Sequence, residues 1–128
     1  MAISNVQLLS VPVSDQDVAR DFYVNVLGFE VRTDANLGPE MRWVMVAPPG
    51  GQTAITLVTW FDSMPAGSLK GLVLETTDLD GDVERLTGLG VKIANGIEDA
   101  PWGRFARFSD PDGNGIVLQA TAADFASR

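Results

Sequence analysis

The chain has 128 residues, a net charge of −8 and neither cysteine nor histidine. This length suits one domain with its own hydrophobic core. An acidic chain repels a phosphate backbone, so we expect no nucleic-acid partner. The absence of cysteine excludes disulfides, thiolate nucleophiles and cysteine-bound metal.

The chain shows no run of about 18 apolar residues, so we expect no membrane partner. Its N-terminal segment lacks the basic and apolar stretches of a secretory signal, which predicts a cytoplasmic protein.

The first half of the chain predicts a strand, a helix and three further strands. Residues 5–13 are mostly apolar and rich in β-formers, which indicates a buried strand. Ser14 and Asp15 offer cap oxygens for a helix that ends at Gly28. Further strands are expected at about 29–34, 41–47 and 53–59. The helix carries one apolar stripe of Val18, Ala19, Phe22, Tyr23, Val26 and Leu27.

The second half repeats this order. A strand at 71–77 precedes a helix that Asp78 caps and Gly90 ends, with Leu79, Val83 and Leu86 as its apolar stripe. Strands are expected at about 91–95, 103–109 and 114–120, with a tight turn at 110–114 before the last. Asp15 and Asp78 lie about half the chain length apart, as do Gly28 and Gly90. The repeat predicts two copies of one βαβββ module.

The predicted domain organisation is a single domain over residues 1–128. Module one covers about 5–60, a linker rich in Pro, Gly and Ser covers 61–70, and module two covers about 71–120. The predicted fold class is therefore α+β.

Two segments carry a family resemblance. They are VSDQDVARDFYVNVLGFEV at residues 13–31 and PWGRFARFSDPDGNGIVL at residues 101–118. Together they resemble the vicinal oxygen chelate superfamily, which includes glyoxalase I, extradiol dioxygenases, fosfomycin-resistance transferases and bleomycin-binding proteins. The resemblance covers about residues 5–120 and implies the glyoxalase/bleomycin resistance/dioxygenase fold, whose two modules curl mixed sheets into a cleft. It also implies a homodimer.

The resemblance implies metal ligands on the central strands, and the corresponding positions here are poor ligands. They are occupied by Leu8, Thr56, Leu72 and Val117. We therefore expect no cofactor and no transition-metal site of the usual His/Glu kind. Glu75 is the one acid inside a central strand, and its parity from Leu72 predicts that it faces away from the cleft.

The same parity predicts an apolar ligand-binding face. Its predicted members are Leu8, Ser10, Thr56, Val58, Trp60, Leu72, Leu74, Trp102, Val117 and Gln119. Trp60 and Trp102 are expected to wall the cleft, and Trp43 is expected to belong to the core.

Three arginines, Arg42, Arg104 and Arg107, could supply charge for an anionic ligand. Solvated sheet edges are the alternative for them, and for Arg104 that alternative is favoured. The residues identify no catalytic group.

The favoured function is a glyoxalase/bleomycin-resistance-like protein that binds an organic small molecule, aromatic or cationic, in an apolar cleft without metal. Two alternatives stay open. One is a lyase, isomerase or dioxygenase of this superfamily, and the other is a catalytically degenerate scaffold that acts through protein contacts.

Overall fold

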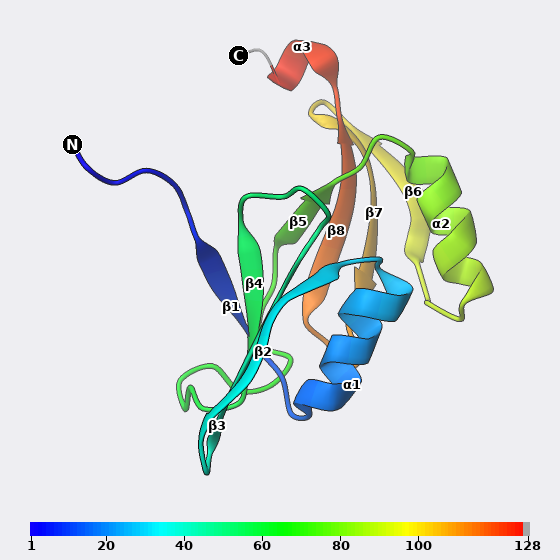
Figure 1. The fold of residues 1–128 in the computed structure, drawn as a ribbon. Helices are drawn as coiled ribbons and strands as arrows, with labels where there is room; N and C mark the ends of the chain where they lie inside the picture. The colour runs from blue at the N-terminus through cyan, green and yellow to red at the C-terminus, as the bar shows by residue number, and fades with distance from the viewer. Residues whose placement is uncertain (127–128) are drawn as a thin grey trace. The chain divides into compact units, whose positions relative to one another are not determined.

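The chain folds into two compact units that each hold a four-stranded mixed sheet (Figure 1). The computed structural model describes residues 1–126. The first unit comprises residues 1–69 and 111–114, and the second comprises residues 70–110 and the chain from residue 115 on. Among the described residues, no helix has the length and apolar character that crossing a membrane requires.

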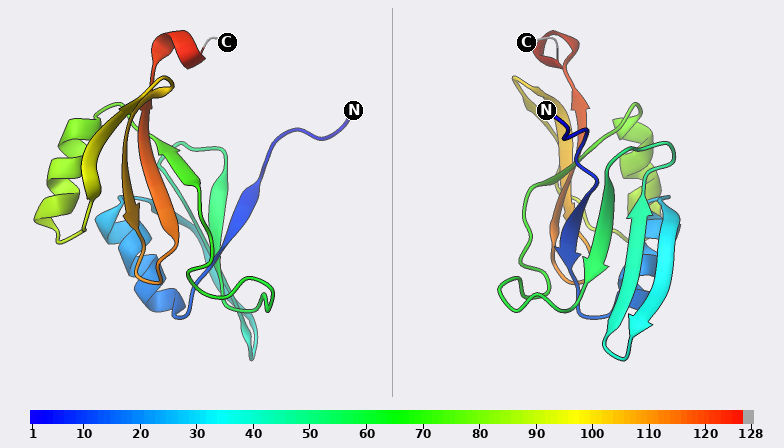
Figure 2. Two further views of the ribbon diagram at one scale, coloured as in Figure 1. Left: turned by 180° about the vertical axis from the view of Figure 1, so that it is seen from behind. Right: turned by 60° about the vertical axis from the view of Figure 1, so that its left-hand side comes forward.

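The first unit contains four strands and one helical segment. Its elements are β1 (Leu8–Pro12), α1 (Gln16–Asp21), the π-helix η1 (Phe22–Val26), β2 (Glu30–Gly38), β3 (Met41–Ala47) and β4 (Ala54–Val58). The strand order is β1-β4-β3-β2, with β1 parallel to β4 and the other pairs antiparallel. The right-hand view of Figure 2 shows α1 behind this sheet, where it contacts β3 and β4.

The second unit repeats that topology. Its elements are β5 (Leu72–Glu75), α2 (Leu79–Gly88), β6 (Ala94–Ala100), β7 (Gly103–Ser109), β8 (Gly115–Thr121) and the short α3 (Ala123–Ala126). The strand order is β5-β8-β7-β6, with β5 parallel to β8, and α2 contacts β7 and β8. The predicted α+β class with two βαβββ modules is confirmed.

The predicted helix ends are confirmed in both units. The Asp15 carboxylate accepts hydrogen bonds from the N–H groups of Asp17 and Val18, and Asp78 accepts one from Gly81. Gly28 and Gly90 have φ of 81° and 88°, the left-handed conformation that ends a helix at low cost in glycine. These local signals recur because the two modules use the same strand-to-helix turn.

The first helix differs from its prediction in its second half. The residues after Asp21 form a π-turn, in which the N–H of Leu27 donates to the carbonyl of Phe22. The extra residue in this turn shifts the later side chains around the axis. In the regular turn before it, Ala19 is fully buried, but Val18, which the predicted stripe places in the core, is 50% exposed.

Two strands have other limits than predicted. β2 continues to Gly38 because Arg42 of β3 binds both carboxylate oxygens of Asp34, which keeps the hairpin paired. β6 begins at Ala94 and not at residue 91, because the N–H of Val91 still donates to Leu86 at the end of α2. Asn95 and Gly96, both with positive φ, then form a bulge and not the end of the strand.

The turn between β7 and β8 belongs to the first unit by its contacts. The Asn114 amide is fully buried, donates to the Pro12 carbonyl at 2.8 Å and accepts from the N–H of Leu69 at 3.0 Å. The N–H and Oγ of Ser14 both donate to Oδ1 of Asp112. The predicted turn is therefore also a clasp, which we define as residues 111–114 with their bonds to Pro12, Ser14 and Leu69.

Candidate functional site

Each sheet has one face covered by its helix and one face without a helix, which we call the helix-free face. In the first unit Gln16 of α1 donates to the carbonyls of Arg42 and Leu57, so α1 lies on one side of β3 and β4. Val44 and Leu57 are fully buried there, as is Ala19 of α1. Paired residues on neighbouring strands project to the same side, so the register identifies the members of the opposite face.

Four predicted site residues lie together on the helix-free face of the first sheet. Ser10 pairs with Thr56, Leu8 pairs with Ala54, and Val58 follows Thr56 by two residues on β4. The four side chains differ in their exposure to solvent. Thr56 and Val58 are 0% and 1% exposed, whereas Leu8 and Ser10 are half-buried and open to contact. Among the described residues, the Thr56 hydroxyl is buried without a hydrogen-bond partner.

Two tryptophans form a stacked pair on this same face. Trp43 lies two residues before Met45, which pairs with Thr56, so its side chain projects to the helix-free side. The Trp60 ring stacks on it with centroids 6.3 Å apart and 25° between the planes, and Phe61 meets Trp60 edge-on. The expectation that Trp43 belongs to the core is wrong, because it is half-buried and carries the partner ring of Trp60.

The second sheet corrects the parity predicted for β5. Leu72 and Leu74 pair with Ile116 and Leu118, whose side chains are buried on the face that α2 covers. The helix-free face instead carries Val73 and Glu75, which pair with Val117 and Gln119. The parity was taken from Leu72 alone, and an error of one residue moves every side chain of a strand to the other face.

Glu75 thus lies on the same face as Gln119, opposite to the prediction. Its carboxylate accepts from the N–H and the hydroxyl of Thr121, at 3.0 and 2.5 Å. The Gln119 amide donates to the same hydroxyl at 2.9 Å. The group is a polar patch of Glu75, Gln119 and Thr121 at one end of the helix-free face.

An aromatic pair also marks the helix-free face of the second sheet. Phe105 pairs with Gln119, and the Trp102 ring stacks on Phe105 with centroids 6.4 Å apart and 22° between the planes. Trp102 is 43% exposed. Trp43 and Phe105 occupy equivalent positions, because each lies two residues before the β3 or β7 residue that pairs with Thr56 or Val117. The duplication therefore repeats an aromatic position on both faces.

Two of the three candidate arginines are engaged in ion pairs on other faces. Hydrogen bonds from Arg42 hold the pKa of Asp34 below its usual value and raise the pKa of Arg42. Arg104 donates to both oxygens of Asp80, which lowers the pKa of that carboxyl and raises the pKa of the arginine. Both sides of the Asp80–Arg104 pair are well exposed, so water screens this attraction.

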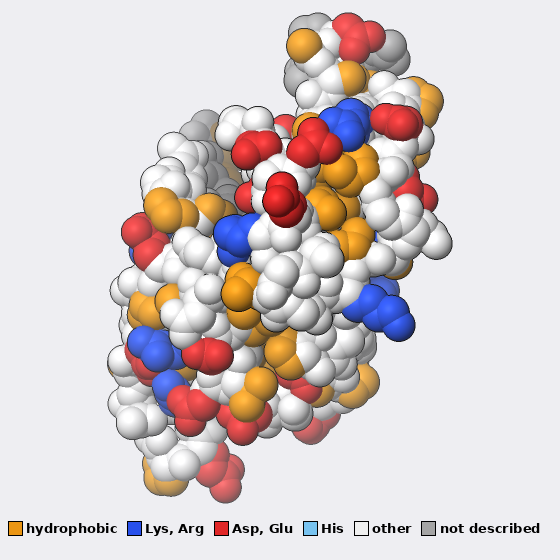
Figure 3. Space-filling model, turned by 90° about the vertical axis from the view of Figure 1, so that its right-hand side faces the viewer, with side chains coloured by type: hydrophobic (Ala, Val, Ile, Leu, Met, Phe, Trp, Pro, Cys, Tyr) orange, Lys and Arg blue, Asp and Glu red, His pale blue; other side chains and the backbone are white. Residues whose placement is uncertain are grey.

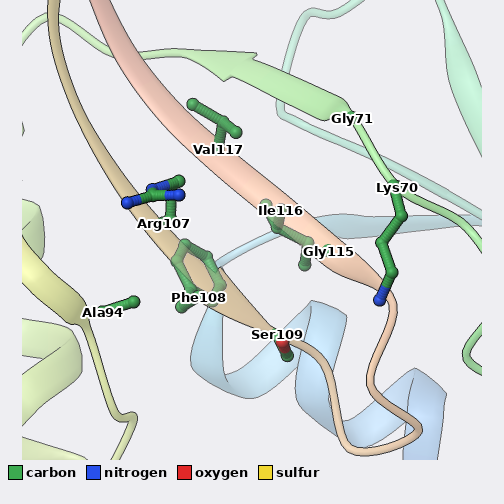
Figure 4. Close-up of a pocket in the computed structure, with 9 residues that line it drawn as sticks. All are labelled: Lys70, Gly71, Ala94, Arg107, Phe108, Ser109, Gly115, Ile116 and Val117. Carbon is green, nitrogen blue, oxygen red and sulfur yellow. The ribbon is translucent and has the colours of Figure 1, made fainter.

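Arg107, the third candidate, lines a hollow. This hollow, of about 360 Å³, lies in the second unit where β7 ends and β5, β6 and β8 begin (Figure 4). Lys70, Gly71, Ala94, Arg107, Phe108, Ser109, Gly115, Ile116 and Val117 line it. Val117 is the one predicted site residue among them.

No metal centre forms among the described residues. Within residues 1–126 no three acidic side chains come close enough together to hold a metal ion. On the face shown in Figure 3, Lys and Arg side chains lie beside Asp and Glu side chains. The ion pairs of Arg42, Arg104 and Arg107 engage part of the acidic charge.

The sequence reasoning missed several residues of the helix-free faces. They are Met45, Val73 and Phe105, and it placed Trp43 in the core and Glu75 on the opposite face. A prediction of how β3 and β7 pair with the last strand of each module would have placed Trp43 and Phe105 on these faces. Trp43 lies two residues before the partner of Thr56, and Phe105 lies two residues before the partner of Val117.

The comparisons with known proteins agree with this architecture. The sequence profile of the Glyoxalase/Bleomycin resistance protein/Dioxygenase superfamily matches residues 5–118. The Bacillus subtilis (strain 168) protein YetH is 33% identical over 120 residues, which cover 91% of this chain and 98% of YetH.

Solved structures show the same likeness. TnmS3, an antibiotic binding protein from Streptomyces sp. CB03234, is 53% identical with a TM-score of 0.91, over 95% of this chain and 99% of that one. A superfamily member from Sphaerobacter thermophilus DSM 20745 is 42% identical with a TM-score of 0.86, over 94% and 99% of the two chains. The chain belongs to the glyoxalase/bleomycin resistance protein/dioxygenase superfamily.

Proposed function

We propose that this protein binds an organic small molecule, without metal, against the aromatic pairs of its helix-free sheet faces. The observation that carries the proposal is the Trp43–Trp60 stack on the face that also holds the half-buried Leu8 and Ser10. Aromatic faces backed by aliphatic side chains are typical of sites for flat organic ligands. The second sheet supports the proposal, because Phe105 and Trp102 repeat the arrangement there.

The relatives support binding as the activity. TnmS3, with which this chain shares 53% of its sequence, is an antibiotic binding protein. Three of the four positions where the family resemblance implies metal ligands carry Leu8, Thr56 and Val117, and none of these side chains suits a transition metal. Binding and sequestration need no metal and no proton transfer, so these residues suffice for them.

We expect loss of either ring of the first pair to weaken binding of a neutral flat probe. Trp60→Ala and Trp43→Ala should each raise the Kd of 2-naphthamide about tenfold, because the probe loses a stacking surface and buried apolar area. Isothermal titration calorimetry measures the Kd without relying on the fluorescence of the deleted ring.

Leu37→Ala is the matched control, since Leu37 is an apolar side chain of the same unit, 62% exposed and outside the pair. It should bind 2-naphthamide like the unchanged protein. The proposal fails if both tryptophan variants keep the original Kd, or if the unchanged protein does not bind the probe at millimolar concentration.

We also propose that the protein is a homodimer. β1 and β5 are edge strands, and they leave apolar side chains exposed at Leu9 (56%) and Val73 (51%). Unpaired edges with apolar side chains favour pairing with another chain. Sedimentation velocity at micromolar concentration should show twice the chain mass, and a stable monomer would contradict this part of the proposal.

A further inference from the structure

The hollow in the second unit brings two positive side chains together in a chain of net charge −8. Figure 4 shows Arg107 and Lys70 at opposite ends of its lining. Its volume, about 360 Å³, lies at the small end of the range for organic ligands. Phe108 and Ile116 are 4% and 1% exposed and project to the other face of the sheet, so Val117 is the apolar side chain that shares a face with Arg107.

Glu98 orients the Arg107 guanidinium. Arg107 Nε donates to Oε2 of Glu98 at 2.8 Å, and Nη2 donates to Oε1 at 3.1 Å. This two-point contact fixes the plane of the guanidinium group. Since arginine carries five N–H donors, three remain, and within the described part of the chain no further acceptor binds them. The Arg107 side chain is 48% exposed, so a ligand can reach them.

A hydrogen bond of the clasp joins the two residues that directly precede Lys70 and Gly115 in the chain. Leu69, the residue before Lys70, donates its N–H to the buried Asn114, the residue before Gly115. Lys70 and Gly115 both line the hollow. The hydrogen bond therefore fixes the backbone on which Lys70 is placed, although its long side chain remains exposed.

Arg107 lies on the same face of β7 as an aromatic pair. It pairs with Val117, and Phe105, two residues earlier on the strand, pairs with Gln119 and stacks on Trp102. Two residues along a strand span roughly 7 Å. A flat molecule that contacts the Phe105 side chain can thus place an acidic group at the free edge of Arg107.

We propose that the second unit binds flat organic carboxylates, with the carboxylate on Arg107 and the apolar body along Val117 towards Phe105. Arginine holds a carboxylate through two parallel N–H donors, and the uncommitted edge of Arg107 has that geometry. This inference rests on the proposed function, since it assigns a ligand class to one of the proposed faces.

The test compares 2-naphthoate with its neutral analogue 2-naphthamide, with Kd values from isothermal titration calorimetry. We expect the unchanged protein to bind the carboxylate about tenfold more tightly, and the preference to shrink as salt rises. Arg107→Gln should abolish the preference and leave the Kd of the amide unchanged. Arg107→Lys should keep part of it, because the charge remains but the fork is lost.

Arg104→Gln is the matched control. Arg104 lies on the same strand, is equally exposed at 48% and is also paired with an acid, but its partner Ala120 places it on the other face. This variant should keep the tenfold preference. The inference is overturned if the unchanged protein binds the carboxylate no more tightly than the amide, or if Arg107→Gln keeps the preference.

The two proposals fail separately. If the amide binds and depends on the tryptophans while the carboxylate shows no preference, the proposed function stands and the carboxylate site is wrong. If neither compound binds at millimolar concentration, both proposals are wrong. The NMR signal of the Arg107 Nε–H group gives a second readout, which should shift with 2-naphthoate and not with 2-naphthamide.

Discussion

Asn114→Ala should lower the free energy of unfolding by about 2–4 kcal/mol. The amide of Asn114 is fully buried and bonds the carbonyl of Pro12 and the N–H of Leu69. Alanine removes both hydrogen bonds: the Leu69 N–H loses its acceptor, while the Pro12 carbonyl still accepts from the N–H of Gly67. A backbone group left unsatisfied costs about 1–3 kcal/mol, and the loss of one hydrogen bond to a group that keeps another costs about 0.5–1.5 kcal/mol. Urea denaturation followed by circular dichroism measures the change as a shift of the midpoint at constant slope.

Asn36→Ala is the control for this prediction. Asn36 is also an asparagine of the first unit, but it is exposed on β2. Its replacement should change stability by less than about 0.5 kcal/mol. Equal effects of the two substitutions would show that the clasp does not hold the turn as described.

Leu86→Ala should cost about 2–5 kcal/mol. Leu86 is fully buried on α2, on the side that packs on the second sheet. Its truncation loses the transfer free energy of the side chain and leaves a cavity. Thermal unfolding by differential scanning calorimetry should show a lower Tm.

Leu89, at the end of the same helix, gives the comparison. It is 55% exposed, so Leu89→Ala should cost less than about 1 kcal/mol. If the two leucine variants unfolded alike, α2 would not be packed on its sheet through Leu86.

The ends of the two main helices were predictable, because each depends on one residue and its immediate neighbours in the chain. Asp15 and Asp78 cap helices because their carboxylates reach the first free N–H groups, and Gly28 and Gly90 end them through positive φ. Neither effect depends on distant parts of the chain. The π-turn after Asp21 was not predictable, since its one extra residue leaves the apolar stripe nearly unchanged in sequence.

The candidate site was predictable only where strand parity was anchored correctly. In the first unit Leu8, Ser10, Thr56 and Val58 do share a face. In β5 the prediction failed by one residue, because both Leu72 and Val73 are apolar and only the pairing with β8 distinguishes their faces. The prediction therefore places Glu75 on the face away from the cleft, whereas Glu75 pairs with Gln119 on the helix-free face.

The hollow could not be predicted, because its lining residues come together through tertiary contacts that no sequence pattern indicates. Lys70 follows the linker, Ala94 begins β6, and Arg107 and Val117 lie on β7 and β8. They meet because the strand order is not the chain order. Arg107 was a candidate for ligand charge from the sequence, and its pairing with Val117 places it on the helix-free face, whereas Arg104 pairs with Ala120 and lies on the other face.

Titration of isotope-labelled protein with 2-naphthamide, followed through the indole N–H signals of its three tryptophans, tests the central claim most directly. If the aromatic pairs on the helix-free faces bind flat organic molecules, the signals of Trp43, Trp60 and Trp102 should shift saturably, while amides on the exposed side of α2 stay in place. Unmoved indole signals, with shifts confined to the helix-covered faces, would contradict the account.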